Sequence, residues 1–184
     1  MKSAIGNRIT VSKMDKETII RISGTIEPWM NHALLGWLVM WTAMGAYVAY
    51  YIFTGKAVTE NMFYFFITYL AFWTYFEVKA LYSWLFRMYG YELIKITSSH
   101  LFVKRTLFGY GKVKRFDREN IVDLKKVEVS RKSVNGAFNK SFWVMGNEQI
   151  QFESLGKVQG FGMHLEEKER NELLVYLRRV LKKK

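Results

Sequence analysis

The 184-residue chain contains no cysteine, which excludes disulfides, thiolate catalysis and cysteine-ligated zinc sites. Its three histidines, His32, His100 and His164, stand far apart, and none has the spacing of a metal site with another ligand. The glycine-containing stretch 109–112 lacks the upstream glycine and the Ser or Thr of a phosphate-binding loop. We therefore expect no catalytic activity, no cofactor, no metal and no small-molecule substrate.

Charge is missing from two long stretches in the first half of the chain. No Asp, Glu, Lys or Arg occurs from Pro28 to Gly55, and none occurs in 61–76. The uncharged stretch 80–86 prolongs the second run beyond Glu77 and Lys79. A hydrocarbon core about 30 Å thick requires about 20 apolar residues in a helix. Both runs are long enough, so the pattern predicts two membrane-spanning helices.

The predicted membrane part is a hairpin of helices at 28–54 and 62–87, joined by a short external loop at 55–61. The net charge is +12, and of 28 Lys and Arg residues, five lie in residues 1–27 and 21 lie from position 87 onward. Positive charge favours the cytoplasmic flanks of membrane helices. We therefore expect a multi-pass protein with both termini in the cytoplasm.

The second apolar run is dense in aromatic residues that cover more than one helix face. A two-helix hairpin cannot bury all of them on itself. They either face lipid or form a docking face for a larger membrane complex, and the sequence leaves both possibilities open. The residues of this predicted partner face are Phe65, Phe66, Tyr69, Phe72, Trp73 and Phe76.

Glu77 is an ionisable residue within the second run, and such residues are functional hypotheses by default. It lies about 24 Å beyond Asn61 at about 1.5 Å per residue, which is close to the inner interface, where it could extend to the headgroups. His32 is predicted at the same depth in an antiparallel hairpin. Glu77 is therefore either structural or part of a polar contact, with His32 or with another subunit.

The remaining sequence predicts strands and one amphipathic helix. In residues 1–27, the alternation of 8–13 and 20–23 suggests a β-hairpin, with a disordered tail as the alternative. Residues 90–184 predict an α+β domain of six or seven antiparallel strands closed by a helix over 165–181. The expected strands are 91–97, 100–108, 112–116, 121–130, 141–145, 149–153 and 157–161. This is the element order of a pleckstrin-homology-like (PH-like) barrel.

Several segments of this domain resemble a known family. They are the strand pair at 91–97 and 101–105, the corner Phe116-Asp117-Arg118-Glu119-Asn120-Ile121, and the segment 150–153 followed by Phe161-Gly162-Met163-His164-Leu165. Residues 62–184 resemble bacterial membrane proteins in which a PH-like domain follows paired transmembrane helices. The resemblance implies this fold and a bacterial inner membrane. It implies no shared activity, and residues 1–27 do not match it.

The domain is also strongly basic, with 21 Lys and Arg against 11 Asp and Glu from position 87 onward. Beside an inner leaflet, each basic side chain contributes about 1 kcal/mol of attraction to anionic lipid. The predicted lipid-binding residues are Lys112, Lys114, Arg115, Arg118, Lys125 and Lys126. The alternative is that they are solvated strand faces. No nucleic acid partner is expected, because no known binding motif is present.

Together these features predict a non-catalytic, membrane-anchored interaction protein, which would be an accessory or assembly subunit of a larger inner-membrane complex. The alternative is a membrane module that recognises anionic lipid of the inner leaflet through its basic face.

Overall fold

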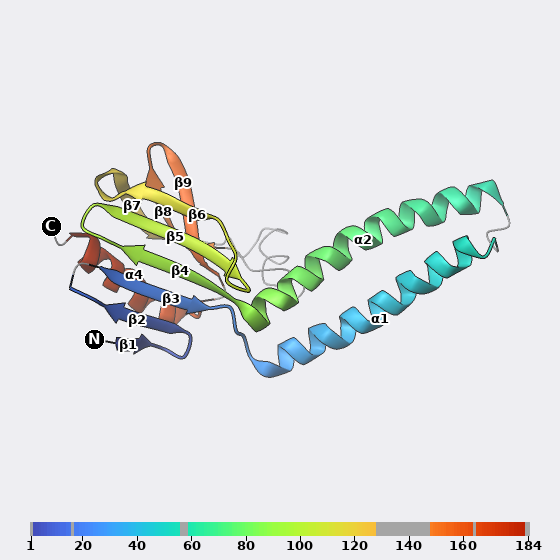
Figure 1. The fold of residues 1–184 in the computed structure, drawn as a ribbon, viewed down its shortest axis with the longest axis horizontal. Coiled ribbons are helices and arrows are strands. Elements are labelled where there is room, and N and C mark those ends of the chain that lie inside the picture. The colour runs from blue at the N-terminus through green and yellow to red at the C-terminus, as the bar shows by residue number, and fades with distance from the viewer. Residues whose placement is uncertain (1, 16, 56–58, 128–147, 164, 183–184) are drawn as a thin grey trace.

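A computed structural model describes residues 2–15, 17–55, 59–127, 148–163 and 165–182. It consists of a small domain from which a long helical hairpin projects (Figure 1). The hairpin contains α1 (Pro28–Phe53) and α2 (Glu60–Tyr89). The domain contains two antiparallel sheets, the short helix η1 (Arg118–Asn120) and the helix α4 (Glu167–Lys182).

The larger sheet has six strands in chain order: β1 (Lys2–Ile5), β2 (Ile9–Lys13), β3 (Thr18–Ser23), β4 (Gly90–Ile96), β5 (His100–Leu107) and β6 (Val113–Asp117). The smaller sheet has three: β7 (Ile121–Lys126), β8 (Glu148–Ser154) and β9 (Lys157–Met163). Neither sheet closes on itself among the described residues, so an α+β fold with open antiparallel sheets replaces the predicted closed barrel. The strand expected at 141–145 lies outside the described residues.

The N-terminal strands belong to the same sheet as the strands after the hairpin. Strand β3 pairs with β4 along its whole length, from Thr18 opposite Ile96 to Ser23 opposite Tyr91. The hairpin is therefore an insertion between two neighbouring strands of one domain. Residues of the segment predicted at 1–27 and of the domain predicted at 90–184 thus share one sheet. Alternation identifies the buried face of a strand but not its neighbour, so the sequence could not indicate the pairing.

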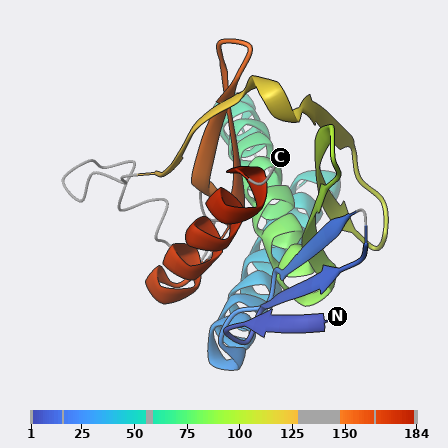
Figure 2. The same cartoon turned by 90° about the vertical axis from the view of Figure 1, so that its left-hand side faces the viewer.

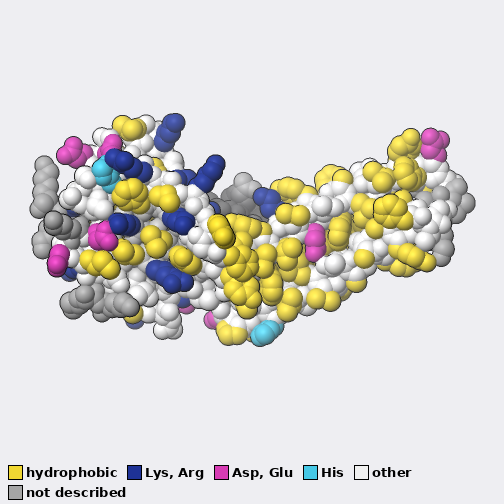
Figure 3. Space-filling view, viewed as in Figure 1, with side chains coloured by type: hydrophobic (Ala, Val, Ile, Leu, Met, Phe, Trp, Pro, Cys, Tyr) yellow, Lys and Arg dark blue, Asp and Glu magenta, His cyan; other side chains and the backbone are white. Residues whose placement is uncertain are grey.

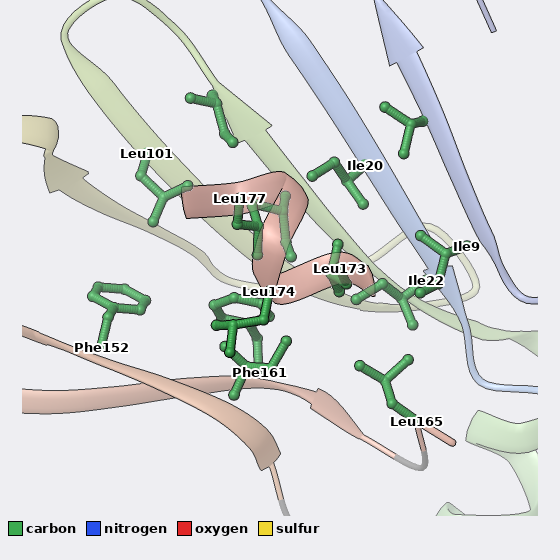
Figure 4. Close-up of a cluster of buried hydrophobic side chains, with 14 residues drawn as sticks. Ile9, Ile20, Ile22, Leu101, Phe152, Phe161, Leu165, Leu173, Leu174 and Leu177 are labelled. Atoms are coloured by element: carbon green, nitrogen blue, oxygen red, sulfur yellow. The ribbon is translucent and has the colours of Figure 1, made fainter. Parts of the chain in front are cut away.

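The core lies between the two sheets and α4 (Figure 2). Apolar residues of the alternating strands and of one face of α4 converge there, including Ile20, Phe152 and Leu173 (Figure 4). The leucines expected on one face of the closing helix are buried or partly buried against this cluster, as predicted from their spacing. The helix begins at Glu167 rather than at 165 because the Glu169 carboxylate accepts a hydrogen bond from the Glu166 backbone N–H.

The two hairpin helices lie side by side and antiparallel (Figure 1). Among the described residues, α1 is the one helix long and apolar enough to cross a membrane. The prediction of two such helices is thus met for the first run only. Helix α2 is longer, but its many tyrosines and the charges of Glu77 and Lys79 lower its hydropathy. It also continues to Tyr89, beyond the predicted end at residue 87.

Candidate functional site

The contact between α1 and α2 is a narrow seam. Leu34 and Leu38 of α1 and Ala80 of α2 are its buried apolar residues. Nearer the hairpin tip, Trp73 packs on Gly45 so closely that a Cβ at Gly45 would lie 2.0 Å from the ring. The indole Nε1 of Trp73 donates a hydrogen bond to the Trp41 carbonyl at 2.9 Å. The seam leaves most apolar side chains of both helices on the outside of the hairpin (Figure 3).

The six aromatic residues of the predicted partner face divide into two groups. Trp73, Phe66 and Tyr69 are partly buried; Trp73 lies in the seam, and the Phe66 ring meets the Tyr51 ring at 5.9 Å. The other three, Phe65, Phe72 and Phe76, are exposed. They are spaced seven and four residues apart, which places them on one side of α2. We call Phe65, Phe72 and Phe76 the outer ridge.

Glu77 contacts α1, but not through His32. Its Oε1 accepts a hydrogen bond from the Thr42 hydroxyl at 2.7 Å. His32 is exposed and lies ten residues, or about 15 Å, before Thr42 along α1. Of the alternatives left open for Glu77, the structure shows a polar contact with α1 at Thr42 rather than at His32. The antiparallel register accounts for this, since Met88 lies beside Asn31 at 3.6 Å and Glu77 is therefore opposite the middle of α1.

The six predicted lipid-binding residues are distributed over several elements of the domain. Lys112, Lys114 and Arg115 lie on or next to β6 of the larger sheet, whereas Lys125 and Lys126 lie on β7 of the smaller one. Arg118 is in η1 between them, and its guanidinium donates to the carbonyls of Val180 and Leu181 at 2.6 and 3.0 Å. Arg118 thus holds the C-terminal end of α4, where cations are favoured.

Three more members of the set contact neighbouring side chains within the domain. Lys114 donates to the Gln159 side chain at 3.1 Å, and Arg115 contacts the His100 ring. Lys125 forms an ion pair with Asp123, which raises the pKa of Lys125 through a side-chain hydrogen bond and charge attraction. Lys112 and Lys126 are exposed.

Sequence reasoning missed a charged cluster between the two sheets. Glu92 is buried, and its Oε1 accepts hydrogen bonds from the Arg105 guanidinium at 3.1 and 3.2 Å. Its Oε2 accepts the Gly162 backbone N–H at 2.6 Å, and Arg105 also reaches Glu148 at 3.1 Å. Glu92, Arg105 and Glu148, with Lys112 and others, line a pocket of about 150 Å³. The sequence feature that could have indicated this cluster is the acidic residue Glu92, which lies among the apolar residues on the buried side of its strand.

This cluster joins the sheets rather than presenting a reactive group. Arg105 pairs with both carboxylates, so the buried Glu92 has the cationic partner that a buried charge requires. Among the described residues, no three His, Asp or Glu side chains gather as a possible metal site. No protein-family model, curated protein or solved structure matches the chain.

Proposed function

We propose that this chain is a non-catalytic, membrane-anchored interaction protein. Helices α1 and α2 cross a bacterial inner membrane as a hairpin, and the α+β domain with both termini lies on the cytoplasmic side. The hairpin is the docking element for a larger membrane complex, of which this chain is an accessory or assembly subunit. The observation that carries the proposal is the exposed apolar surface of the hairpin, including the outer ridge.

The place of the hairpin in the domain supports a double crossing. Because β3 and β4 pair beside each other, both ends of the hairpin leave the domain at one place. A hairpin so inserted that crosses a bilayer must cross it twice, once with each helix. The 26 residues of α1 give a length of about 39 Å, and the 30 residues of α2 give about 45 Å. Both lengths exceed the hydrocarbon thickness of about 30 Å.

The outer ridge supports a protein partner over a purely lipid-facing role. Phe65, Phe72 and Phe76 stand in one row, and aromatic residues are enriched in protein interfaces. Recognition of anionic lipid by a basic face has less support, since five of the six predicted residues are divided between two sheets and Arg118 binds α4.

The test is purification of the full chain in several mild detergents, followed by mass spectrometry of co-purifying proteins. We expect a defined partner that is lost when Phe65, Phe72 and Phe76 are all replaced by leucine, which keeps the surface apolar. A matched control replaces the exposed Val39 and Met40 of α1 by leucine and should retain the partner. A lone chain under every condition would contradict the accessory-subunit role.

A further inference from the structure

The turn between β5 and β6 carries an aromatic residue in an unfavourable conformation. Leu107 and Tyr110 pair across a two-residue turn in which Phe108 has φ 51° and Gly109 has φ 86°. Two-residue hairpin turns with both central residues at positive φ favour Asn-Gly or Asp-Gly. A bulky residue at positive φ is strained, and such strain concentrates at functional positions. Phe108 is nevertheless 55% exposed, and Tyr110 is 85% exposed.

This turn lies against the base of the hairpin (Figure 1). Leu107 is paired with Gly90, the residue that directly follows α2. The Phe108 ring packs on the ring of Tyr89, the last residue of α2, with centroids 4.9 Å apart. Lys104 donates a hydrogen bond from Nζ to the Gly109 carbonyl at 3.1 Å, which supports the turn from the strand side.

We infer that this turn is a second membrane contact, with Phe108 and Tyr110 inserted in the interfacial layer of the leaflet from which the hairpin emerges. The inference rests on the proposed membrane hairpin. Helix α2 is about 45 Å long, which matches the 40–45 Å of a bilayer with its headgroup layers. Its last residue, Tyr89, and the adjoining Phe108 therefore lie at headgroup depth.

The chemistry of the turn fits that layer. Aromatic residues are enriched at membrane interfaces because their rings are apolar and their polar groups stay hydrated. Lys104 and Lys112 flank the turn in sequence and add charge complementary to anionic headgroups. With the hairpin as one attachment and the turn as another, the domain is held in a fixed orientation on the leaflet.

The β8–β9 turn provides a matched control within the same domain. It also has a bulky residue at positive φ, Leu155 at 52°, followed by Gly156 at 73°, and Leu155 is 77% exposed. It lies at the other end of the domain, because Gly162, near the end of β9, contacts Glu92 close to the hairpin base. Apolar exposure and backbone strain are thus similar in the two turns, and their positions relative to the hairpin differ.

The test uses spin labels at single cysteines, which the cysteine-free chain accepts without background. Full-length Tyr110→Cys, Leu155→Cys and Phe72→Cys are labelled and reconstituted in vesicles of mixed zwitterionic and anionic phospholipid. Collision with oxygen, which concentrates in lipid, is compared with collision with a polar nickel chelate. We expect the oxygen-to-nickel ratio to be several-fold higher at positions 110 and 72 than at position 155.

The outcomes separate this inference from the proposed function. A lipid-exposed label at 72 with a water-exposed label at 110 overturns the inference and leaves the membrane hairpin in place. A water-exposed label at 72 overturns both. A label at 110 that neither reagent reaches indicates a protein contact and overturns the lipid assignment.

A second variant tests whether the Phe108 side chain anchors the turn, and it is chosen so that the fold is not destabilised. Phe108→Asn replaces the ring with a residue that tolerates positive φ, so the domain should remain as stable as the parent in thermal unfolding. In the chain that carries the spin label at position 110, Phe108→Asn should lower the oxygen-to-nickel ratio several-fold. Leu155→Asn in the same labelled chain should leave that ratio unchanged. An unchanged ratio in Phe108→Asn would refute the anchoring role of this side chain.

Discussion

The domain and the hairpin are both rich in apolar side chains, but they use them in opposite ways. In the domain, apolar residues from two sheets and α4 enclose one another, and many are fully buried. In the hairpin, Leu34, Leu38 and Ala80 are the buried apolar residues of the seam, and large residues such as Phe65 and Phe72 point outward. Water is a poor solvent for such a surface. The domain therefore supplies its own core, whereas the hairpin exposes the kind of apolar surface that marks contacts with lipid or another protein.

The sharpest way to break this comparison is to truncate one leucine in each region. Leu173→Ala removes a fully buried side chain of α4 (0% exposed) and should destabilise the domain by about 2–5 kcal/mol. Leu81→Ala removes a side chain of α2 that is 41% exposed, and it should cost less than about 1 kcal/mol. Urea unfolding of the full chain in detergent, followed by hydrogen exchange in β4 and β8 for Leu173→Ala and in α2 for Leu81→Ala, measures both.

Equal losses of stability in the two variants would contradict the division into a self-sufficient core and an externally covered hairpin. A loss confined to Leu173→Ala would confirm it.

Local sequence patterns predicted the helices and strands well, but they did not predict which distant segments pair. The spacing of Leu173, Leu174 and Leu177 predicted the apolar face of α4, and strand alternation predicted β2 and β3. Strand β3 pairs with β4 across the inserted hairpin, so the paired residues are more than sixty positions apart in the sequence. The alternation within one strand does not indicate such a distant neighbour.

The candidate site was predicted less well for the same reason. The partner of Glu77 depends on the register between the two helices, which aligns Asn31 with Met88 and Thr42 with Glu77, and no local pattern in the sequence indicates that register. The strands expected at 100–108 and 112–116 leave a turn at 109–111, whereas the structure places the two central turn residues at Phe108 and Gly109. The difference moves Phe108 from the end of a strand into the turn and pairs Tyr110 with Leu107.

A second test compares two glycines of α1 that differ in their surroundings. A Cβ at Gly45 would meet the Trp73 ring at 2.0 Å, whereas a Cβ at Gly36 would meet nothing within 4 Å. Gly45→Ala should separate the helices and destabilise the hairpin by about 1–3 kcal/mol. Gly36→Ala should be neutral or slightly stabilising, because alanine is the better helix former. Thermal unfolding in detergent, followed by the far-ultraviolet helix signal, distinguishes them.

A smaller effect of about 1.5 kcal/mol is expected at the link between the β1–β2 turn and α4. The Arg8 guanidinium lies 2.6 Å from the Glu169 carboxylate. Burial alone raises the pKa of Glu169, but hydrogen bonds from Arg8 and from backbone N–H groups outweigh it and lower the pKa below its ordinary value of 4.5. A lowered folded-state pKa gives stability that is present above about pH 4.5 and lost as the pH falls through the folded value.

Glu169→Gln should therefore reduce stability at neutral pH and flatten the loss of stability on acidification. Denaturant midpoints measured between neutral pH and pH values below 4.5 test this, since the two proteins should converge at the acid end. A constant difference across the whole range would show that Glu169 acts through packing rather than through its charge.

The smallest effect concerns the polar contact inside the hairpin. Thr42→Val removes the hydrogen bond to Glu77 and should weaken the hairpin by about 0.6 kcal/mol, which is typical of hydrogen bonds between membrane helices. Thr74→Val is the control, because the Thr74 hydroxyl bonds the Leu70 carbonyl of its own helix. A double-mutant cycle with Glu77→Gln isolates the pair. Zero coupling would mean that the seam is held by apolar packing alone, and that Glu77 is retained for a contact outside the hairpin.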